Sequence, residues 1–209
     1  MILLILIFCE QNESMKSRCK WVGDDRQYIK YHDEEWGVPL RDDQKLFEFL
    51  TLETFQAGLN WLLVLKKREN FCLAFDQFDY MKIARYDEKK INELISDQGI
   101  IRNRMKIKAA VNNAACFIKV QEEFGSFSHY TWGFVRGKPV QNAWSNDSDI
   151  PASTALSDRI SADLKRRGFK FVGSRVVYAH MQATGMVNDH TIDCFRHREV
   201  QNIAAEFKD

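Results

Sequence analysis

The sequence is poor in the residues that break helices, with only 3 proline and 10 glycine residues among 209. This scarcity argues against collagen-like, low-complexity and turn-dense all-β architectures. No apolar run reaches the roughly 18 residues that a membrane span needs, so no membrane partner is expected. The charges almost cancel, with 30 Lys and Arg against 29 Asp and Glu, which excludes a polybasic tail or a highly charged disordered chain. Nucleic acid binding stays open, because a basic face can be balanced by acids elsewhere.

The cysteines and the first residues bear on where the protein works. Five cysteines is an odd number, and their scattered positions do not form the framework of a small secreted protein. We therefore expect reduced thiols in a cytoplasmic protein. Met1 to Phe8 is apolar, but it lacks the basic segment and the small-residue cleavage site of a signal peptide. We prefer a non-native or dispensable extension over residues 1–14, with Met15 as the initiator of a single domain over residues 15–209, to a working signal.

Helical periodicity dominates the rest of the chain, and the sustained alternation of strands is absent. In the segment 42–57, apolar residues recur at helical spacing after a capping aspartate, Asp42 or Asp43. The other expected helices run from Leu59 to Arg68, from Asp87 to Gly99, from Ile101 past Cys116, from Ser157 to Gly168 and from Val176 to Thr184. A loop is expected from Gly137 to Pro151. The pattern predicts one all-α domain.

Residues 94–110 predict two helices joined by a sharp turn at Gly99. A helix that begins near Ile101 would direct free N–H groups and a positive dipole end at a phosphate. The basic residues that follow, with no acid among them, are Arg102, Arg104, Lys106 and Lys108. This pattern favours binding to a nucleic acid backbone, and a second acid-free basic stretch, 165–175, adds to it. The alternative is two packed helices with a solvated basic face.

Cysteine and histidine residues gather near both ends of the chain. Cys19 and His32 lie near the start, and His190 and Cys194 are spaced so that they could share one helical face. Two thiolates and two imidazoles make a closed tetrahedral zinc site of structural type, which would join the two ends. The spacing also arises by chance, and His197 is a competing ligand.

One carboxylate is out of place in the predicted helix 42–57. Glu53 shares the apolar face of Leu46, Leu50 and Ala57, where a carboxylate needs a partner or a purpose. The aromatic residues nearby in sequence are Trp21, Tyr28, Tyr31, Trp36 and Trp61. Aromatic faces with one carboxylate would suit a flat, cationic heterocycle. The alternative is a core glutamate that an arginine neutralises.

Seven blocks in this order carry a resemblance to a known family. They are RCKW at 18–21, YIKYHDEEWGVP at 28–39, LETFQAGLNW at 52–61, VLKKREN at 64–70, DQGIIRNRMKIKA at 97–109, LKRRGFKFVG at 164–173 and VNDHTIDC at 187–194. The sequence resembles the DNA-3-methyladenine glycosylase I family, a zinc-containing branch of the helix-hairpin-helix DNA glycosylases. The resemblance implies an all-α fold of that type, with a zinc site joining the N- and C-terminal segments, and excision of 3-methyladenine from alkylated DNA.

The resemblance also implies roles for individual residues. Glu53 falls on the catalytic base-pocket carboxylate, Tyr31 on a hydrogen-bonding tyrosine and Trp61 on a stacking tryptophan, while Tyr28 and Trp21 line the pocket. The implied ligands of one structural Zn²⁺ are Cys19, His32, His190 and Cys194. The implied DNA-binding residues are Gly58, Leu59, which could fill the gap left by a flipped base, Gly99, Ile101, Arg102 and Lys106. Asn60 stands where the family often has serine, and Thr54 and Phe55 also depart from its pattern.

The expected reaction follows from this resemblance. The enzyme would extrude the damaged nucleotide from duplex DNA, hold the cationic base and let water attack the sugar, releasing free 3-methyladenine. No aspartate follows Lys108 in the predicted helix, and no lysine is clearly placed as a Schiff-base nucleophile. We therefore expect a monomeric, monofunctional hydrolase without lyase activity. Whether Glu53 acts as a general base or only in recognition stays open. The rival interpretation, a non-catalytic zinc-containing DNA-binding module, is less favoured because Glu53, Tyr31 and Trp61 are all present.

Overall fold

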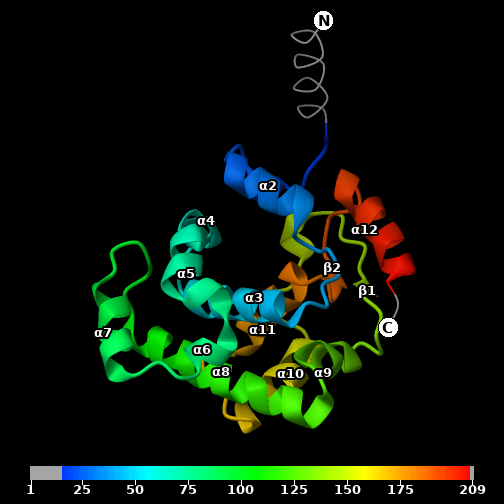
Figure 1. The fold of residues 1–209 in the computed structure, drawn as a ribbon. Coiled ribbons are helices and arrows are strands. Elements are labelled where there is room, and N and C mark those ends of the chain that lie inside the picture. Colours follow the sequence, from blue (N-terminus) through cyan, green and yellow to red (C-terminus); the bar gives the residue numbers. More distant parts are fainter. Residues whose placement is uncertain (1–15, 208–209) are drawn as a thin grey trace, which may run out of the picture.

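The computed structural model of the protein describes residues 16–207, so the extension 1–14 and the predicted start at Met15 lie outside the described residues. Helices form almost all of the regular structure of this part (Figure 1), as predicted. The α-helices are α2 (Arg26–Glu34), α3 (Asp43–Gln56), α4 (Trp61–Lys66), α5 (Arg68–Ala74), α6 (Tyr80–Ile83), α7 (Glu88–Ser96), α8 (Arg104–Phe124), α9 (Phe127–Gly133), α10 (Ala155–Arg166), α11 (Ser174–Ala183) and α12 (Phe195–Glu206), and the 3₁₀ turns are η1 (Lys20–Val22), η2 (Asp76–Phe78) and η3 (Asp147–Asp149). Over residues 16–207, no helix is both long and apolar enough to cross a membrane.

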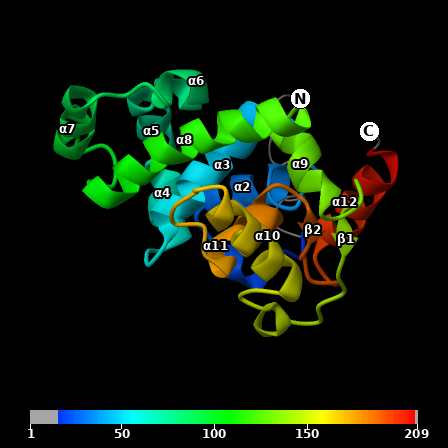
Figure 2. The ribbon, with the colours of Figure 1, turned by 90° about the horizontal axis from the view of Figure 1, so that it is seen from below.

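Helix α3 runs through the centre of the molecule (Figures 1 and 2). Asp42 caps it by accepting a hydrogen bond from the Lys45 N–H, as the sequence predicts. Every residue from Leu46 to Phe55 is buried, because α4, α8, α9 and α11 pack around the helix. The periodicity predicted that only one face of this helix would be buried, whereas the structure buries all of its faces between Leu46 and Phe55. The helix is a core element, so each polar side chain on it needs a partner or a purpose.

Helices α7 and α8 form the predicted helix pair, but the connection is longer than expected. Helix α7 ends at Ser96, and α8 begins at Arg104 behind the capping side chain of Asn103 rather than near Ile101. Gly99 is not the left-handed residue of a sharp turn. A Cβ there would lie 3.0 Å from Asp97 Oδ1 and 3.2 Å from the Asn70 side chain, so the position is crowded.

A short parallel sheet has one of its two strands within the segment 137–151, where the sequence predicted only a loop. Strand β1 (Val140–Gln141) pairs with β2 (Val187–Asn188), and Trp144 forms an isolated bridge with Thr191. Two residues a strand are too few for any alternation to show in the sequence. The pairing brings the segment 137–151 beside the segment that holds His190, far away in sequence, and this contact completes the candidate site.

Candidate active site and metal centre

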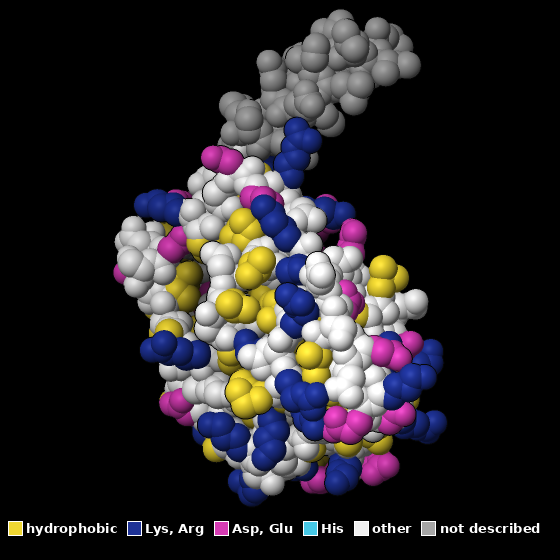
Figure 3. All heavy atoms as spheres, turned by 90° about the vertical axis from the view of Figure 1, so that its left-hand side faces the viewer, with side chains coloured by type: hydrophobic (Ala, Val, Ile, Leu, Met, Phe, Trp, Pro, Cys, Tyr) yellow, Lys and Arg dark blue, Asp and Glu magenta, His cyan; other side chains and the backbone are white. Residues whose placement is uncertain are grey.

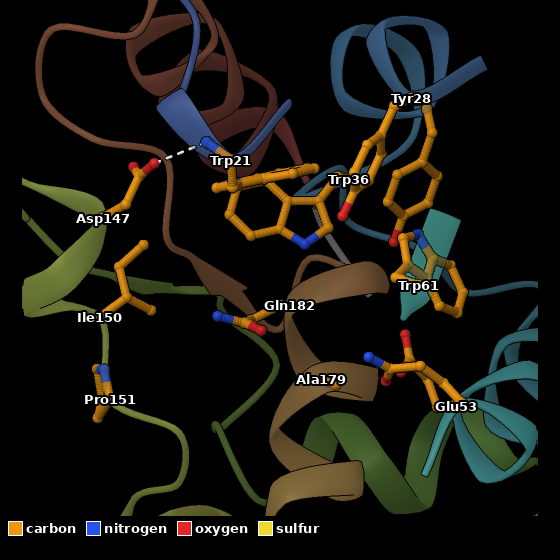
Figure 4. Close-up of a pocket in the computed structure, with 12 residues that line it drawn as sticks. Trp21, Tyr28, Trp36, Glu53, Trp61, Asp147, Ile150, Pro151, Ala179 and Gln182 are labelled. Atoms are coloured by element: carbon orange, nitrogen blue, oxygen red, sulfur yellow. Dashed lines mark hydrogen bonds between the residues drawn. The ribbon is translucent and has the colours of Figure 1, made fainter. Parts of the chain in front are cut away.

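A cavity of about 320 Å³ opens between α3, α11 and the N-terminal segments. In Figure 4, Glu53 and Trp61 lie at one end, Asp147 and Pro151 lie at the other, and Gln182 of α11 lies between them. The five residues predicted for a base pocket all line this cavity, namely Trp21, Tyr28, Tyr31, Glu53 and Trp61. The structure therefore brings together residues from η1, α2, α3 and the first turn of α4.

Glu53 is the unusual group of the cavity. It is 3% exposed, and its Oε2 is buried without a hydrogen-bond partner. No cation within the described residues forms an ion pair with it, so the alternative of a core glutamate neutralised by an arginine is not supported. Burial raises the pKa of Glu53 to about 8. The carboxyl group is thus buried at the wall of the cavity, with an acceptor that a ligand could use.

Aromatic rings form the walls on either side of this carboxyl group. The ring centroids of Tyr31 and Trp61 lie 5.3 Å apart, and Trp21 contacts both Tyr28 and Trp36, at 5.0 and 4.9 Å. Trp61 Nε1 is a buried donor without a partner. Burial raises the pKa of the Tyr31 hydroxyl well above its usual range, which keeps it neutral. The cavity therefore offers flat apolar surfaces together with a few polar groups that a ligand could satisfy.

The far end of the cavity comes from segments that sequence reasoning missed. Trp36, which the sequence placed in the aromatic cluster around Glu53, also lines the cavity, as does Gln56; the missed lining residues are Asp147, Ile150, Pro151, Ala179 and Gln182. Asp147 Oδ2 accepts a hydrogen bond from the Trp21 N–H at 2.8 Å, so the loop at η3 is fastened to the opposite wall. No motif in the sequence marks these five residues, because they reach the cavity only through long-range packing.

Asp189 connects the base cavity to the Cys/His residues. The side chain is 1% exposed and accepts four hydrogen bonds. Asn142 Nδ2 and Trp144 Nε1 donate to Oδ1, both at 2.7 Å, and Tyr178 Oη and Gln182 Nε2 donate to Oδ2, at 2.6 and 2.8 Å. Because Gln182 lines the cavity and His190 follows Asp189 directly, the two sites share one support.

The four predicted metal ligands meet at one point. Their ligand atoms all lie within 4.8 Å of one another, and all four residues are buried. They are Cys19, His32, His190 and Cys194. The predicted common helical face of the last two is wrong. His190 follows β2, and Cys194 is the N-cap of α12, so a tight turn brings the two side chains together.

Both imidazoles are oriented for ligation. His32 Nδ1 lies 2.7 Å from a carboxylate oxygen of Asp33, and His190 Nε2 lies 3.0 Å from the carbonyl oxygen of Trp36. Since these partners only accept, His32 Nε2 and His190 Nδ1 face the thiols with free lone pairs. The group can therefore hold a metal ion. His197 is not part of it, because its Nε2 lies 2.9 Å from the Asn142 carbonyl oxygen.

A second cavity, of about 270 Å³, adjoins the first and continues past its rim. One side is the turn from Ala57 to Leu59, and the other includes Arg175 and Val176 of α11. Leu59 is 40% exposed. Gly58 has φ +79°, a left-handed conformation that favours glycine, and a Cβ there would meet nothing within 4 Å. The turn therefore presents Leu59 at the wall of the second cavity, which shares Gln56 and Gln182 with the first.

The basic residues of the helix pair do not act as one group. Lys106 is 6% exposed, and its Nζ donates to the carbonyl oxygens of Phe55 and Ala57 at 2.7 and 2.6 Å. The structure thus contradicts the phosphate contact expected of Lys106, which instead caps the C-terminus of α3. Arg104 and Lys108 form ion pairs with Glu88 on α7. The basic segment 102–108 contains no acidic residue, so its sequence alone does not show this neutralisation.

Arg102 differs from these neighbours. It is exposed in the connection between α7 and α8 and forms no ion pair within the described part of the chain. Gly99 and Ile101, predicted with it as DNA-binding residues, are half-buried. Lys67 Nζ donates to the Gly99 carbonyl oxygen at 3.0 Å, so the connection is fastened to the end of α4.

Comparison with known proteins decides the family. Residues 21–197 match the family described as methyladenine glycosylase. The chain belongs to the methyladenine glycosylase family. It is 48% identical over 177 residues to DNA-3-methyladenine glycosylase 1 of Escherichia coli K12, with 85% of this chain and 95% of that protein covered. It is 45% identical over 180 residues to DNA-3-methyladenine glycosylase of Haemophilus influenzae, with 86% and 97% covered.

Solved structures of methyladenine glycosylases agree with this assignment. A crystal structure of 3-methyladenine DNA glycosylase I has a TM-score of 0.84 and 47% identity, covering 86% of this chain and 98% of that one. The enzyme from Staphylococcus aureus, solved to study 3-methyladenine recognition, has a TM-score of 0.83 and 37% identity, covering 85% and 95%. The resemblance stated from the sequence is thereby confirmed as a family. Its helix-hairpin-helix branch stays a prediction.

Proposed function

We propose that this protein is a DNA glycosylase that flips 3-methyladenine out of alkylated duplex DNA and hydrolyses its N-glycosidic bond. The observation that carries the proposal is Glu53, a buried carboxyl group with an unpartnered oxygen inside an aromatic cavity. Adenine methylated at N3 within DNA is flat and positively charged, so it offers a π-face to the rings and a cation to the carboxylate. The names of the relatives point to the same substrate.

The cavity residues divide the work of the reaction. Trp61 stacks against the flipped base, an interaction worth roughly 1–3 kcal/mol, and the Tyr31 hydroxyl forms a hydrogen bond with it. Glu53 accepts a hydrogen bond from the exocyclic amine and, once ionised, offsets the charge of the base. Water attacks C1′ of the sugar as the C1′–N9 bond breaks, so the base leaves as neutral 3-methyladenine and the water proton passes to solvent. We assign Glu53 to recognition and charge stabilisation.

We infer that the enzyme is monofunctional. A lyase needs an amine beside the sugar to form a Schiff base, and none of the residues that line the base cavity is a lysine. Lys106, the buried lysine beside the DNA-facing turn, already donates to two carbonyl oxygens. Asn113, where a catalytic aspartate could stand on α8, binds the backbone of Lys170 at both ends of its amide.

We place the DNA on the face that carries the turn at Leu59 and the connection between α7 and α8. Figure 3 views the molecule from this side, with hydrophobic side chains along its middle, Lys and Arg beside them and most acidic side chains nearer the edges. Leu59 fills the gap left by the flipped nucleotide, and Arg102 contacts a phosphate. Such contacts position the duplex without reading its sequence.

We propose that the Cys/His group holds one structural Zn²⁺. A tetrahedral site with Zn–S near 2.3 Å and Zn–N near 2.1 Å places sulfur and nitrogen about 3.6 Å apart, and Cys194 Sγ lies 3.5 Å from both His32 Nε2 and His190 Nδ1. Arg18 donates hydrogen bonds to both carboxylate oxygens of Asp33, which in turn orients His32. All four donors come from the protein, so the ion would fasten both ends of a cytoplasmic, monomeric enzyme and take no part in the chemistry.

The decisive experiment for the function measures free 3-methyladenine released from methylated duplex DNA. The expected result is release of the base without strand cleavage, because no lyase step follows. Unmethylated DNA of the same sequence is the control. A protein that binds the duplex and releases no base would be the non-catalytic DNA-binding module instead.

The zinc is tested by metal analysis of the purified protein and of Cys194→Ser, with Cys72→Ser as the control. Cys72 is a cysteine outside the group. We expect one zinc per chain in the wild type and in Cys72→Ser, and a lower metal content and melting temperature in Cys194→Ser. Folded, active protein without zinc would refute the site.

A further inference from the structure

A few side chains stand where the base cavity and the second cavity meet. Four residues line both cavities, namely Gln56, Pro151, Ala179 and Gln182. With the base held at Glu53 and Trp61 and the sugar on the side of the second cavity, the glycosidic bond lies beside these shared residues. Proline and alanine have no polar side-chain atom, so the two glutamines are the polar groups at this junction.

Gln182 is held in one orientation. It lies near the C-terminal end of α11, and its Nε2 donates to Asp189 Oδ2 at 2.8 Å. Because a carboxylate only accepts hydrogen bonds, the amide cannot turn over without placing its own oxygen against Asp189. The backbone is fixed as well, since the Gly37 N–H donates to the Gln182 carbonyl oxygen at 3.0 Å. The side chain extends from α11 into the space between Glu53 and Asp147 (Figure 4).

The other end of this amide is an acceptor without a partner. Gln182 Oε1 forms no hydrogen bond within residues 16–207, so it is open to a molecule in the cavity. Gln56, the second glutamine at the junction, differs because neither end of its side-chain amide is bonded within the same residues. Only Gln182 therefore presents an acceptor in a direction that the protein has set beforehand.

The damaged nucleotide has no donor to offer this oxygen. In the proposed function, the exocyclic amine, the one N–H donor of 3-methyladenine, binds Glu53. Beside the glycosidic bond, N9 carries the sugar and N3 carries the methyl group. Deoxyribose has no hydroxyl at C2′, and its other oxygens are in the ring or esterified to phosphate. Water is therefore the donor that fits Gln182 Oε1.

We propose that Gln182 positions the water that attacks C1′. This role rests on the proposed function and gives the water a place in it. The amide oxygen accepts one O–H of the water, and the water oxygen forms the new bond to C1′ as the C1′–N9 bond breaks. The base leaves with the electron pair of that bond as neutral 3-methyladenine. The water proton passes to solvent, because an amide oxygen is too weakly basic to keep it.

The test compares Gln182→Met with Trp144→Phe. Gln182→Met keeps the volume of the side chain but has neither the donor to Asp189 nor the acceptor for water. Trp144→Phe removes a different donor to Asp189, the Nε1 that lies 2.7 Å from Oδ1, and Trp144 is not among the residues that line either cavity. Two quantities are measured, the single-turnover rate of excision from methylated duplex DNA and the affinity for free 3-methyladenine, which also counts the folded molecules.

The two variants should separate the water from the support of Asp189. We expect Gln182→Met to excise about 10- to 100-fold more slowly, because a misplaced reactant costs up to about 100-fold in rate. Its affinity for free 3-methyladenine should stay near that of the wild type, since Oε1 contacts the water and not the base. Trp144→Phe should melt at a lower temperature, as Gln182→Met does, but excise at the wild-type rate per folded molecule.

Methanol added to the assay reports on the water itself. Methanol that attacks C1′ leaves a methyl glycoside in the DNA instead of an abasic site. In the wild type, the held water should keep the methyl glycoside well below the molar share of methanol in the solvent. Gln182→Ala leaves space and no acceptor, so its methyl glycoside should approach that share. Equal shares in the two proteins would overturn the proposal.

Two other results would also overturn it. In one, Gln182→Met excises as fast as the wild type. In the other, its affinity for free 3-methyladenine falls in step with its excision rate, which would mean that Gln182 contacts the base. A wild type that releases no 3-methyladenine is a different failure, because it refutes the proposed function and the role of Gln182 with it.

Discussion

Helix α3 buries two glutamates under opposite conditions. Glu48 is 6% exposed, and its carboxylate accepts hydrogen bonds from Arg68 Nε at 2.7 Å and Lys45 Nζ at 2.8 Å. Glu53, further along the same helix, is 3% exposed; within residues 16–207 it pairs with no cation, and its Oε2 has no hydrogen-bond partner. Glu48 shows how this fold neutralises a carboxylate that serves structure. The missing partner of Glu53 therefore indicates that it is matched to a charge from outside the protein.

Removing the structural glutamate should have the largest effect on stability. Glu48→Ala leaves the half-buried guanidinium of Arg68 with Glu35 as its remaining ion-pair partner. We expect a loss of about 3 kcal/mol in the free energy of unfolding, measured by urea denaturation, with normal excision per folded molecule. Unchanged stability would mean that the pairing of Glu48 is not what α3 requires.

The two glutamates should also differ in how pH acts on stability. Burial raises the pKa of Glu53 from 4.5 to about 8, so the folded state binds more protons than the unfolded state between these values. Its contribution to stability is complete below the unfolded pKa and is lost as the pH rises through about 8. From about pH 5 to about pH 8, the wild type should lose about 2–3 kcal/mol more than Glu53→Gln. Parallel denaturation curves for the two proteins would contradict the raised pKa.

Substitution of Glu53 should lower the rate of excision and leave stability largely unchanged, whereas substitution of Glu48 should lower stability and leave excision unchanged. Glu53→Gln keeps the volume but removes the negative charge and turns one acceptor into a donor that opposes the adenine amine. We expect excision to fall by about 10- to 100-fold, or about 1.4–2.7 kcal/mol of transition-state stabilisation. Binding to undamaged DNA should barely change, and the melting temperature should largely survive. If the melting temperature collapses while the remaining folded enzyme excises normally, Glu53 belongs with Glu48 as a structural residue.

The smallest effect is expected at the exposed partner of Glu48. The Lys45 side chain is 55% exposed, so solvent screens its ion pair. Lys45→Ala should change the free energy of unfolding by no more than about 0.5 kcal/mol, in the same urea experiment. A loss as large as that of Glu48→Ala would show that Lys45, and not Arg68, neutralises the carboxylate.

Local rules account for what the sequence could predict. The aspartates at 42 and 87 cap helices because a side-chain oxygen accepts an N–H of its own first turn, which needs no tertiary information. Glu53 was noticed because periodicity placed a carboxylate among apolar residues. Trp61 lies in the same sequence block as Glu53, at 52–61, and Tyr28 and Tyr31 lie in the preceding block, at 28–39.

Long-range pairing accounts for what could not be predicted. The acid that neutralises Arg104 and Lys108 is on the neighbouring helix, and the carbonyl oxygens that Lys106 caps belong to α3. A basic run in a sequence does not show which of its members will meet such partners. The same limit hid Asp147 and Gln182, because strands of two residues bring their segments together.

Asp189 shows what it takes to bury a charge when no cation is used. Its four donors replace the water that an exposed carboxylate would bind, so the protein itself serves as the hydration shell of this group. That shell is complete only when α11 and the segments 142–144 and 187–194 have all docked. In a partly folded state the Asp189 carboxylate would be removed from water without all of its hydrogen-bond donors. Such intermediates are therefore high in free energy, which favours a single cooperative folding step. The base cavity and the metal centre are therefore expected to form, and to be lost, together.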